Sequence, residues 1–448
     1  MQGIIKGFQQ LLKYPSALVG LTLIALLLIT SILTVIFIPR EEAVRLWRGG
    51  EAVWGQNPKT VPPAWTNMFR SNKLPETIIL TQSDPTAEIE ATPRQEGENR
   101  IILYSFDYTA DAAPQDVVFN FTSTYTARNP FVSIFWITPD GREIRLVEQG
   151  INYNFTYRVI QDDKLRRRLG GISPEAGLFD NPETEALDIL KGEYQIVIDT
   201  LTFEDESTIS KADVVLHGKV YGLFGTDNQR RDLTIGILWG VPIALAFGLV
   251  ASFGTSIAGI IFAAISVWYG GWVDELIQRI TEINLNLPVL SILIMIGTFY
   301  SKSIVVILGA TVLLSIFSGA IKSYRAIFMQ VKESPYIEAA RSYGASSSRV
   351  IFSYMIPRVT PLLIPGLVLG VPNFVFLEAT LASLNLGDPV LPTWGKIIYE
   401  AWQTGGAVYN GYYYWILEPA ILLIITGLGF AMVGFAMDRI FNPRLRDI

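Results

Sequence analysis

The sequence predicts an α-helical polytopic membrane protein with six transmembrane helices and a β-rich, sandwich-like insertion outside the cytoplasm. Half of the 448 residues are hydrophobic and only 17% are charged. The apolar residues gather in runs of about 20, the helix length that crosses a bilayer core of about 30 Å. A block of different composition, rich in acidic residues and in short alternating segments, separates the first run from the second.

The first run, Ala17 to Ile38, has no charge and follows a short amphipathic start at residues 4–12. It is too long for a signal-peptide core, and no small-residue cleavage site follows it, so we expect a retained membrane helix. The next uncharged stretch, 233–273, has no charged turn in its middle and favours one long tilted helix over about 235–268. Further uncharged runs complete the six expected spans at residues 283–301, 303–321, 359–377 and 419–437.

The charge of the connecting segments predicts the orientation. The N-terminus, residues 274–282, residues 322–358 and the tail together hold 12 lysines and arginines, whereas the short loops on the other side hold little more than Lys302 and Lys396. The positive-inside rule therefore places both termini and the 322–358 loop in the cytoplasm, and residues 41–232 outside it. Because the chain has no cysteine, no disulfide supports the external part, which suits a prokaryotic inner membrane.

The external block carries 30 acids and 20 bases, a net charge of −10. Period-two alternation within it predicts short strands joined by turns, as in a β-sandwich. The strands are expected at residues 77–80, 100–104, 117–121, 132–137, 152–157 and 194–198, with helical or irregular structure over 41–72 and 174–190. The predicted domains are therefore 1–40 (amphipathic start and first span), 41–221 (insertion) and 222–448 (five further spans).

Several classes of function lack their sequence signals. The net charge of −6 argues against nucleic-acid binding, and no phosphate-binding Gly-x-x-x-x-Gly-Lys-Ser/Thr run exists. The single histidine, His217, has no second histidine or cysteine to share a metal, so we expect a structural role for it. Glu204-Asp205-Glu206 could hold a cation but more often such a run is a solvated loop. We therefore expect no catalytic residues, metal or cofactor in this chain.

The cytoplasmic loop between the fourth and fifth spans carries the most informative pattern. Ser334 can cap a helix that starts at Pro335, and Gly344 can end it in the left-handed conformation. Ala339 and Ala340 would let a neighbouring surface approach closely, and Glu338 and Arg341 place charges beside them. The loop is predicted to dock into a partner; a solvated connecting helix is the alternative.

In the fifth span, Glu378 is an ionisable group near the outer end, together with Pro372 and Asn373. Such a group indicates either a role in a translocation path or a simple contact with interfacial water or a neighbouring backbone.

The run Glu338-Ala339-Ala340, then Gly344 and Met355-Ile356-Pro357, resembles the "EAA" loop of permease subunits of binding-protein-dependent ABC importers. Further motifs in the same order resemble the second permease subunit of the dipeptide, oligopeptide and nickel branch. They are Gly225-Thr226-Asp227-Asn228, Tyr269-Gly270-Gly271-Trp272-Val273-Asp274, Leu287-Pro288, Glu378-Ala379, Leu384-Asn385-Leu386-Gly387, Pro392-Thr393-Trp394-Gly395 and Asn442-Pro443-Arg444-Leu445-Arg446. Two departures stand out: Arg230 occupies a usual glycine position, and the insertion is much longer than the family's segment.

The resemblance implies a type I ABC importer permease fold, a similar permease as dimer partner, two ATPase subunits at the coupling helix and an external substrate-binding protein. Peptides are the implied substrate class, and ATP hydrolysis belongs to separate subunits. Pro335, Glu338, Ala339, Ala340, Arg341 and Gly344 would form the ATPase contact. The alternative is a membrane-anchored receptor or assembly protein whose β-domain binds a partner, although a simple anchor needs only one span.

Overall fold

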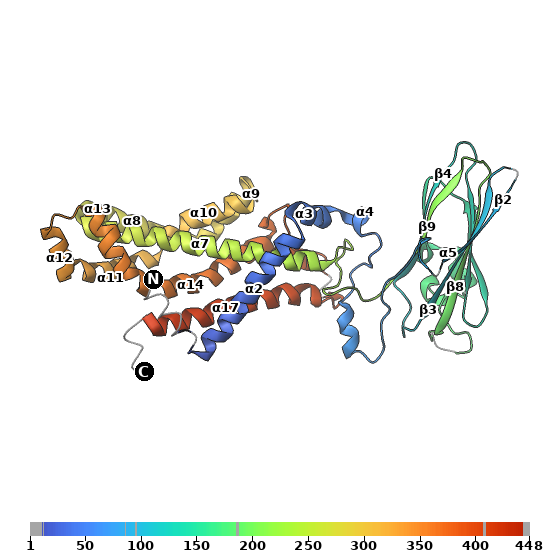
Figure 1. The fold of residues 1–448 in the computed structure, drawn as a ribbon, viewed down its shortest axis with the longest axis horizontal. Helices are drawn as coiled ribbons and strands as arrows, with labels where there is room; N and C mark the ends of the chain where they lie inside the picture. The colour runs from blue at the N-terminus through green and yellow to red at the C-terminus, as the bar shows by residue number, and fades with distance from the viewer. Residues whose placement is uncertain are drawn as a thin grey trace. The chain divides into compact units, whose positions relative to one another are not determined.

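The computed structural model describes residues 11, 13–85, 87–94, 96–184, 188–405 and 409–441. Most of the predicted amphipathic start and the tail motif at 442–446 lie outside the described residues. The chain divides into a helical unit, Met1–Arg48 with Ile235–Ile448, and a β-rich unit, Gly49–Thr234 (Figure 1).

The helical unit contains long apolar helices and several shorter ones. Four helical stretches of the described chain are long and apolar enough to cross a membrane, and two bent helix pairs raise the number to six. The long helices are α2 (Pro15–Phe37), α7 (Leu233–Tyr269), α14 (Ile356–Leu381) and α17 (Tyr414–Phe441); the bent pairs are α8 (Gly271–Asn286) with α9 (Val289–Phe299) and α10 (Ile304–Ile316) with α11 (Gly319–Lys332). The shorter elements are α3 (Arg40–Arg48), α12 (Pro335–Ser342), α13 (Ser347–Arg349), α15 (Trp394–Gln403) and the π-helical turns Val350–Met355 and Ala382–Leu386 on either side of α14.

The single long helix expected at 235–268 is confirmed by α7, whereas the third and fourth spans are not the continuous helices expected at 283–301 and 303–321. The third bends by 75° between α8 and α9, where Pro288 lacks an amide donor and Leu287 before it is extended. The fourth bends by 46° between α10 and α11. The side-chain amide of Asn284 donates to the carbonyls of Leu314 and Phe317 at 2.9 and 3.0 Å, which satisfies backbone acceptors at that second bend.

Glycines allow close packing along α7. A Cβ on Gly240 would lie 2.2 Å from the ring of Trp394, the first residue of α15, whose indole N–H donates to the carbonyl of Ile237 at 3.0 Å. The ring of Trp47 on α3 packs in the same way against Gly236, where a Cβ would lie 2.7 Å from the ring. Only glycine fits these places because the aromatic rings touch the helix backbone.

The β-rich unit is a two-sheet antiparallel sandwich, as predicted. One sheet has the order β1-β9-β4-β7 and the other β2-β3-β8-β5-β6. The strands are β1 (Ile78–Leu80), β2 (Ala87–Pro93), β3 (Glu98–Tyr108), β4 (Asp116–Thr124), β5 (Phe131–Ile137), β6 (Glu143–Gly150), β7 (Asn154–Arg158), β8 (Gly192–Leu201) and β9 (Thr208–His217). Aromatic side chains from both sheets, including Tyr104, Phe119 and Trp136, fill one shared core.

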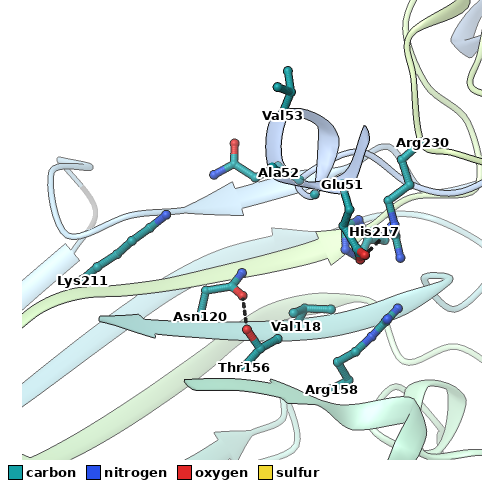
Figure 2. A pocket seen from close by; sticks show the side chains of 12 residues that line it. Glu51, Ala52, Val53, Val118, Asn120, Thr156, Arg158, Lys211, His217 and Arg230 are labelled. Atoms are coloured by element: carbon teal, nitrogen blue, oxygen red, sulfur yellow. Dashed lines mark hydrogen bonds and ion pairs between the residues drawn. The ribbon is translucent and has the colours of Figure 1, made fainter. Parts of the chain in front are cut away.

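Short helices decorate this unit. They are α4 (Gly50–Trp54), the 3₁₀ turns Ala64–Phe69 and Val159–Gln161, α5 (Asp163–Arg168) and α6 (Pro174–Gly177). Residues of α4 and of strands β4, β7 and β9 line a cavity of about 520 Å³ (Figure 2).

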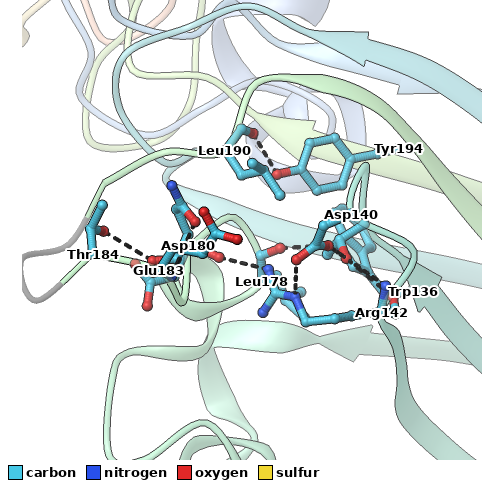
Figure 3. A network of polar contacts seen from close by, with 11 residues as sticks. Trp136, Asp140, Arg142, Leu178, Asp180, Glu183, Thr184, Leu190 and Tyr194 are labelled. Carbon is cyan, nitrogen blue, oxygen red and sulfur yellow. Dashed lines mark hydrogen bonds and ion pairs between the residues drawn. The ribbon is translucent and has the colours of Figure 1, made fainter.

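Side-chain bonds to the backbone carbonyls of residues 178, 180 and 190 hold these residues against the second sheet (Figure 3). The indole of Trp136 donates to the carbonyl of Leu178, and the hydroxyl of Tyr194 to that of Leu190. Arg142 donates to the carbonyl of Asp180 at 2.8 Å. Each of these bonds satisfies one backbone carbonyl.

The observed unit boundaries differ from the predicted insertion at 41–221. Residues Arg40–Arg48 form α3, whose buried Ala43 and Trp47 pack in the helical unit. At the other end, the amide of Thr226 donates to the carbonyl of Val61 at 2.9 Å, so the segment before α7 belongs to the β-rich unit. Both boundaries differ from the predicted ones for the same reason: each depends on contacts between residues far apart in sequence.

Candidate functional site

The candidate site is α12, the short helix between the fourth and fifth spans. Pro335 occupies its first turn, where a missing amide donor has no cost. Ser334 holds the N-cap position by its extended backbone, but its hydroxyl donates to the carbonyl of Gln330 and caps nothing, so the predicted side-chain cap is absent.

The helix ends as predicted at Gly344, whose φ of +79° is left-handed. The amide of Gly344 donates to the carbonyl of Arg341 at 2.9 Å, and that of Ala345 to the carbonyl of Ala340 at 3.0 Å. This pair of bonds is a Schellman motif, which satisfies the last carbonyls and turns the chain sharply toward α13.

The two faces of α12 have different surroundings. Ile337 is 1% exposed and packs in a cluster with Phe328 of α11, Val267 of α7 and Ile351. Ala340 is also buried, so the predicted patch of two small residues is divided: Ala339 faces outward and Ala340 inward. The outward residues of the described helix and its end are Pro335, Tyr336, Glu338, Ala339, Arg341, Ser342, Tyr343 and Gly344.

Two charged side chains, Arg341 of α12 and Lys332 at the end of α11, contact the end of α7. The guanidinium of Arg341 lies 5.7 Å from the ring centroid of Trp268. The ammonium of Lys332 donates to the carbonyls of Val267 and Trp268 at 2.8 and 3.3 Å. A cation at the C-terminus of a helix stabilises the last carbonyls there. The bundle therefore holds α12 by its buried face and by Arg341, close to the C-terminus of α7.

An ion pair joins three neighbouring helices behind α12. Arg325 of α11 donates to both carboxylate oxygens of Asp274 of α8 at 2.5 and 2.8 Å, and the hydroxyl of Ser266 of α7 donates to the same carboxylate. Two parallel bonds of this kind fix orientation as well as distance. The carboxylate of Asp274 thus links α7, α8 and α11 to one another.

The residues proposed for a translocation path are not brought together. Glu378 is 6% exposed near the end of α14 and accepts a hydrogen bond from Thr393, whose hydroxyl also caps α15. Pro372 is buried in the bundle, whereas Asn373 is exposed. Glu378 is enclosed at the packed α14–α15 junction, where it bonds the side-chain hydroxyl of Thr393, and a role for it in a translocation path stays a prediction.

The sequence reasoning did not assign roles to Lys332, Asp274 and Arg325. A usable signal was present, because ionisable groups at the ends of apolar spans commonly pair with one another.

The acidic run at Glu204 does not form a cation site. The carboxylate of Glu204 accepts hydrogen bonds from the backbone amides of residues 126–128, each at 2.8 Å, and these bonds lower the pKa of Glu204. In the described part of the chain, no group of three or more His, Cys, Asp and Glu side chains could hold a metal ion.

Comparison with known proteins decides the family. Residues 255–447 match the family model described as "Binding-protein-dependent transport system inner membrane component". The oligopeptide transport system permease protein OppC of Bacillus subtilis is 30% identical over 225 residues, which cover 50% of this chain and 72% of that protein. The chain belongs to this family. It is a multi-pass permease subunit of an ABC importer.

Other relatives agree with this assignment. The permease is 28% identical over 244 residues to the dipeptide transport system permease protein DppC of Lactococcus lactis, covering 54% of this chain and 69% of that one. It is 29% identical over 221 residues to the peptidoglycan transport system permease protein YejE of Agrobacterium fabrum, covering 49% and 56%. A solved inward-facing structure of the MetNI methionine ABC transporter matches with a TM-score of 0.36 and 18% identity, over 47% of this chain and 96% of that one.

Proposed function

We propose that this permease imports peptides as one of two membrane subunits, with two ATPase subunits on its cytoplasmic side and a substrate-binding protein outside. The peptide class rests on the names of the relatives, which include oligopeptide and dipeptide permeases. The receptor or assembly-protein alternative has no comparable support, because the matched region is the span-bearing part of the chain rather than the β-rich unit.

One observation carries the coupling role: α12 presents a charged and small-residue face outward while its other face is fixed in the bundle. Glu338 and Ala339 are exposed, whereas Ile337 and Ala340 are buried. A helix held in this way transmits a push on its outer face to the helices behind it. We expect ATP-driven closure of the ATPases to move α12 and, through Lys332 and the Asp274–Arg325 pair, to reorient the spans.

The proposed orientation places α12 in the cytoplasm and the acidic β-rich unit outside. The positively charged segments lie on the α12 side of the spans by sequence. The β-rich unit has its own aromatic core and a net negative composition, which suits contact with a protein better than with anionic lipid. We propose that it helps to receive the binding protein or covers the entrance to the path.

The ATPase contact is tested by exchanging charge on the outer face of α12. In the assembled complex, Glu338→Lys should reduce ATPase co-purification and peptide uptake. Glu333→Lys, the same exchange at an exposed residue just before the helix, is the matched control and should have little effect. Equal behaviour of the two variants and the unchanged protein would refute the docking role.

The substrate class is tested separately. The complex is purified with its binding protein, and retained ligands are identified by mass spectrometry. Recovered peptides would support peptide import. Recovery of only sugars, opines or metal chelates would contradict it while leaving the coupling role in place.

A further inference from the structure

The cavity beside α4 in the β-rich unit has a lining that the transport assignment does not explain. Its lining includes three cationic side chains, Arg158, Lys211 and Arg230, and one acidic side chain, Glu51 (Figure 2). A volume of about 520 Å³ lies in the range of small-molecule sites. The lining belongs entirely to the β-rich unit, so the cavity is defined within one compact body.

Arg230 is the cation with the weakest compensation. Arg158 has a close carboxylate partner in Asp116 at 2.9 Å, and Lys211 has Asp213 at 3.0 Å. Arg230 instead donates to the carbonyl of Asn57 at 2.6 Å, and its ion-pair partner, Glu51, lies 3.9 Å away, with Asp116 acting on it from farther off. Its side chain is 9% exposed, so water screens its charge poorly.

The backbone at Arg230 is also unusual. Its φ is +64°, a left-handed conformation that glycine adopts without strain and arginine does not. Strain of this kind persists where the surroundings over-determine it, and it is frequent at ligand sites. Here it carries the guanidinium toward the part of the cavity into which Arg158 also points (Figure 2).

The buried His217 is a second observation that points to a ligand in this cavity. It lines the cavity, is 1% exposed, and its Nδ1 has no hydrogen-bond partner. Burial, together with the positive charges of Arg230 and Arg158, lowers the pKa of this histidine to about 3. Arg158 also lowers the pKa of Arg230, after burial. The neutral imidazole leaves the two guanidinium groups as the positive charges of this part of the cavity, and an anion between them would offset their repulsion.

We propose that this cavity binds a small carboxylate, held between the guanidinium groups of Arg158 and Arg230. Guanidinium groups offer paired N–H donors that match a carboxylate. The existing neighbour of Arg230 is itself a carboxylate, that of Glu51, which is 76% exposed and lies beyond hydrogen-bonding distance. Glu51 thus occupies the approach to the site loosely, as a competitor that an incoming carboxylate displaces.

Binding is measured on the full-length protein in detergent micelles, with L-lactate as the probe. Isothermal titration calorimetry gives the affinity. Because His217 is the only histidine, selective ¹⁵N-histidine labelling gives a single imidazole whose signals report on the site. Lactate should bind saturably and shift these signals. The neutral lactamide should do neither.

Two substitutions should move the affinity in opposite directions. Arg230→Gly removes the guanidinium and relieves the left-handed strain, so the protein should fold and lose lactate affinity by at least about tenfold. Glu51→Gln removes the competitor and should tighten binding by up to about fivefold. Arg145→Gln, at an exposed ion pair with Glu148 outside this lining, is the control and should change nothing.

Defined results would overturn the proposal. Absence of saturable lactate binding would refute the proposed site. Equal binding of lactamide would show that the charge of the ligand plays no part. Binding of inorganic phosphate without binding of lactate would contradict the carboxylate class. Weaker binding in the Glu51→Gln protein would contradict the competitor role.

Discussion

Valine at Gly344 should misplace α12, the helix proposed to contact the ATPase. With φ at +79°, Gly344 is left-handed, and a Cβ there would meet no atom within 4 Å. The expected penalty is therefore purely conformational, about 1–2 kcal/mol for an L-residue and greater for a β-branched one. A penalty of that size reduces the population of the Schellman turn by about 5- to 30-fold.

Three substitutions at this position separate conformation from side-chain bulk. Asparagine tolerates the left-handed region and should keep ATPase co-purification and transport close to the original level. Alanine should reduce both, and valine should reduce them most, while the thermal stability of the bundle changes little because the effect is local. If valine supports the same transport as asparagine, the turn does not position α12 and the reasoning fails.

Further predictions concern stability. Gly240→Ala should destabilise the protein by about 1–3 kcal/mol, since its Cβ would lie 2.2 Å from Trp394, whereas Gly309→Ala, with open space, should not. Asp274→Asn should cost about 1–3 kcal/mol in thermal unfolding in detergent, and a double-mutant cycle with Arg325 should show coupling. Burial lowers the pKa of His217 to about 3, against an ordinary value of 6.5. Between these two pH values the imidazole binds a proton in the unfolded chain and does not in the folded chain. Stability should fall as the pH drops from about 6.5 toward 3, more in the original protein than in His217→Gln; equal pH dependence would refute this.

Local sequence patterns predicted the spans, the sandwich and the ends of α12 because each depends on near neighbours. Uncharged runs identify apolar helices, and Pro335 and Gly344 mark the start and end of a short one. All six predicted strands are present. Strands β2, β6 and β9 were not among them. In β2 every residue after Ala87 is exposed, and β6 and β9 carry charged residues within them.

Features that depend on distant residues could not be predicted in this way. The bend in the fourth span involves Asn284 and carbonyls 30 and 33 residues away. The division of Ala339 and Ala340 between two faces depends on which side of α12 meets the α7 and α11 residues. The clustering of Arg158 and Arg230 joins strand β7 to the segment before α7, and no spacing in the sequence indicates it.

The most direct test of the coupling claim is crosslinking from α12 to the ATPase. The chain has no cysteine, so Ala339→Cys provides a single thiol on the exposed face of the helix. Tyr153→Cys, which replaces a 55% exposed residue of the β-rich unit, is the control. A short reagent with one thiol-reactive end and one photoactivatable end should join Ala339→Cys, and not Tyr153→Cys, to the ATPase in the assembled complex, with a yield that changes when ATP is bound. Crosslinks from Tyr153→Cys, or none from Ala339→Cys in a complex that transports, would contradict the account.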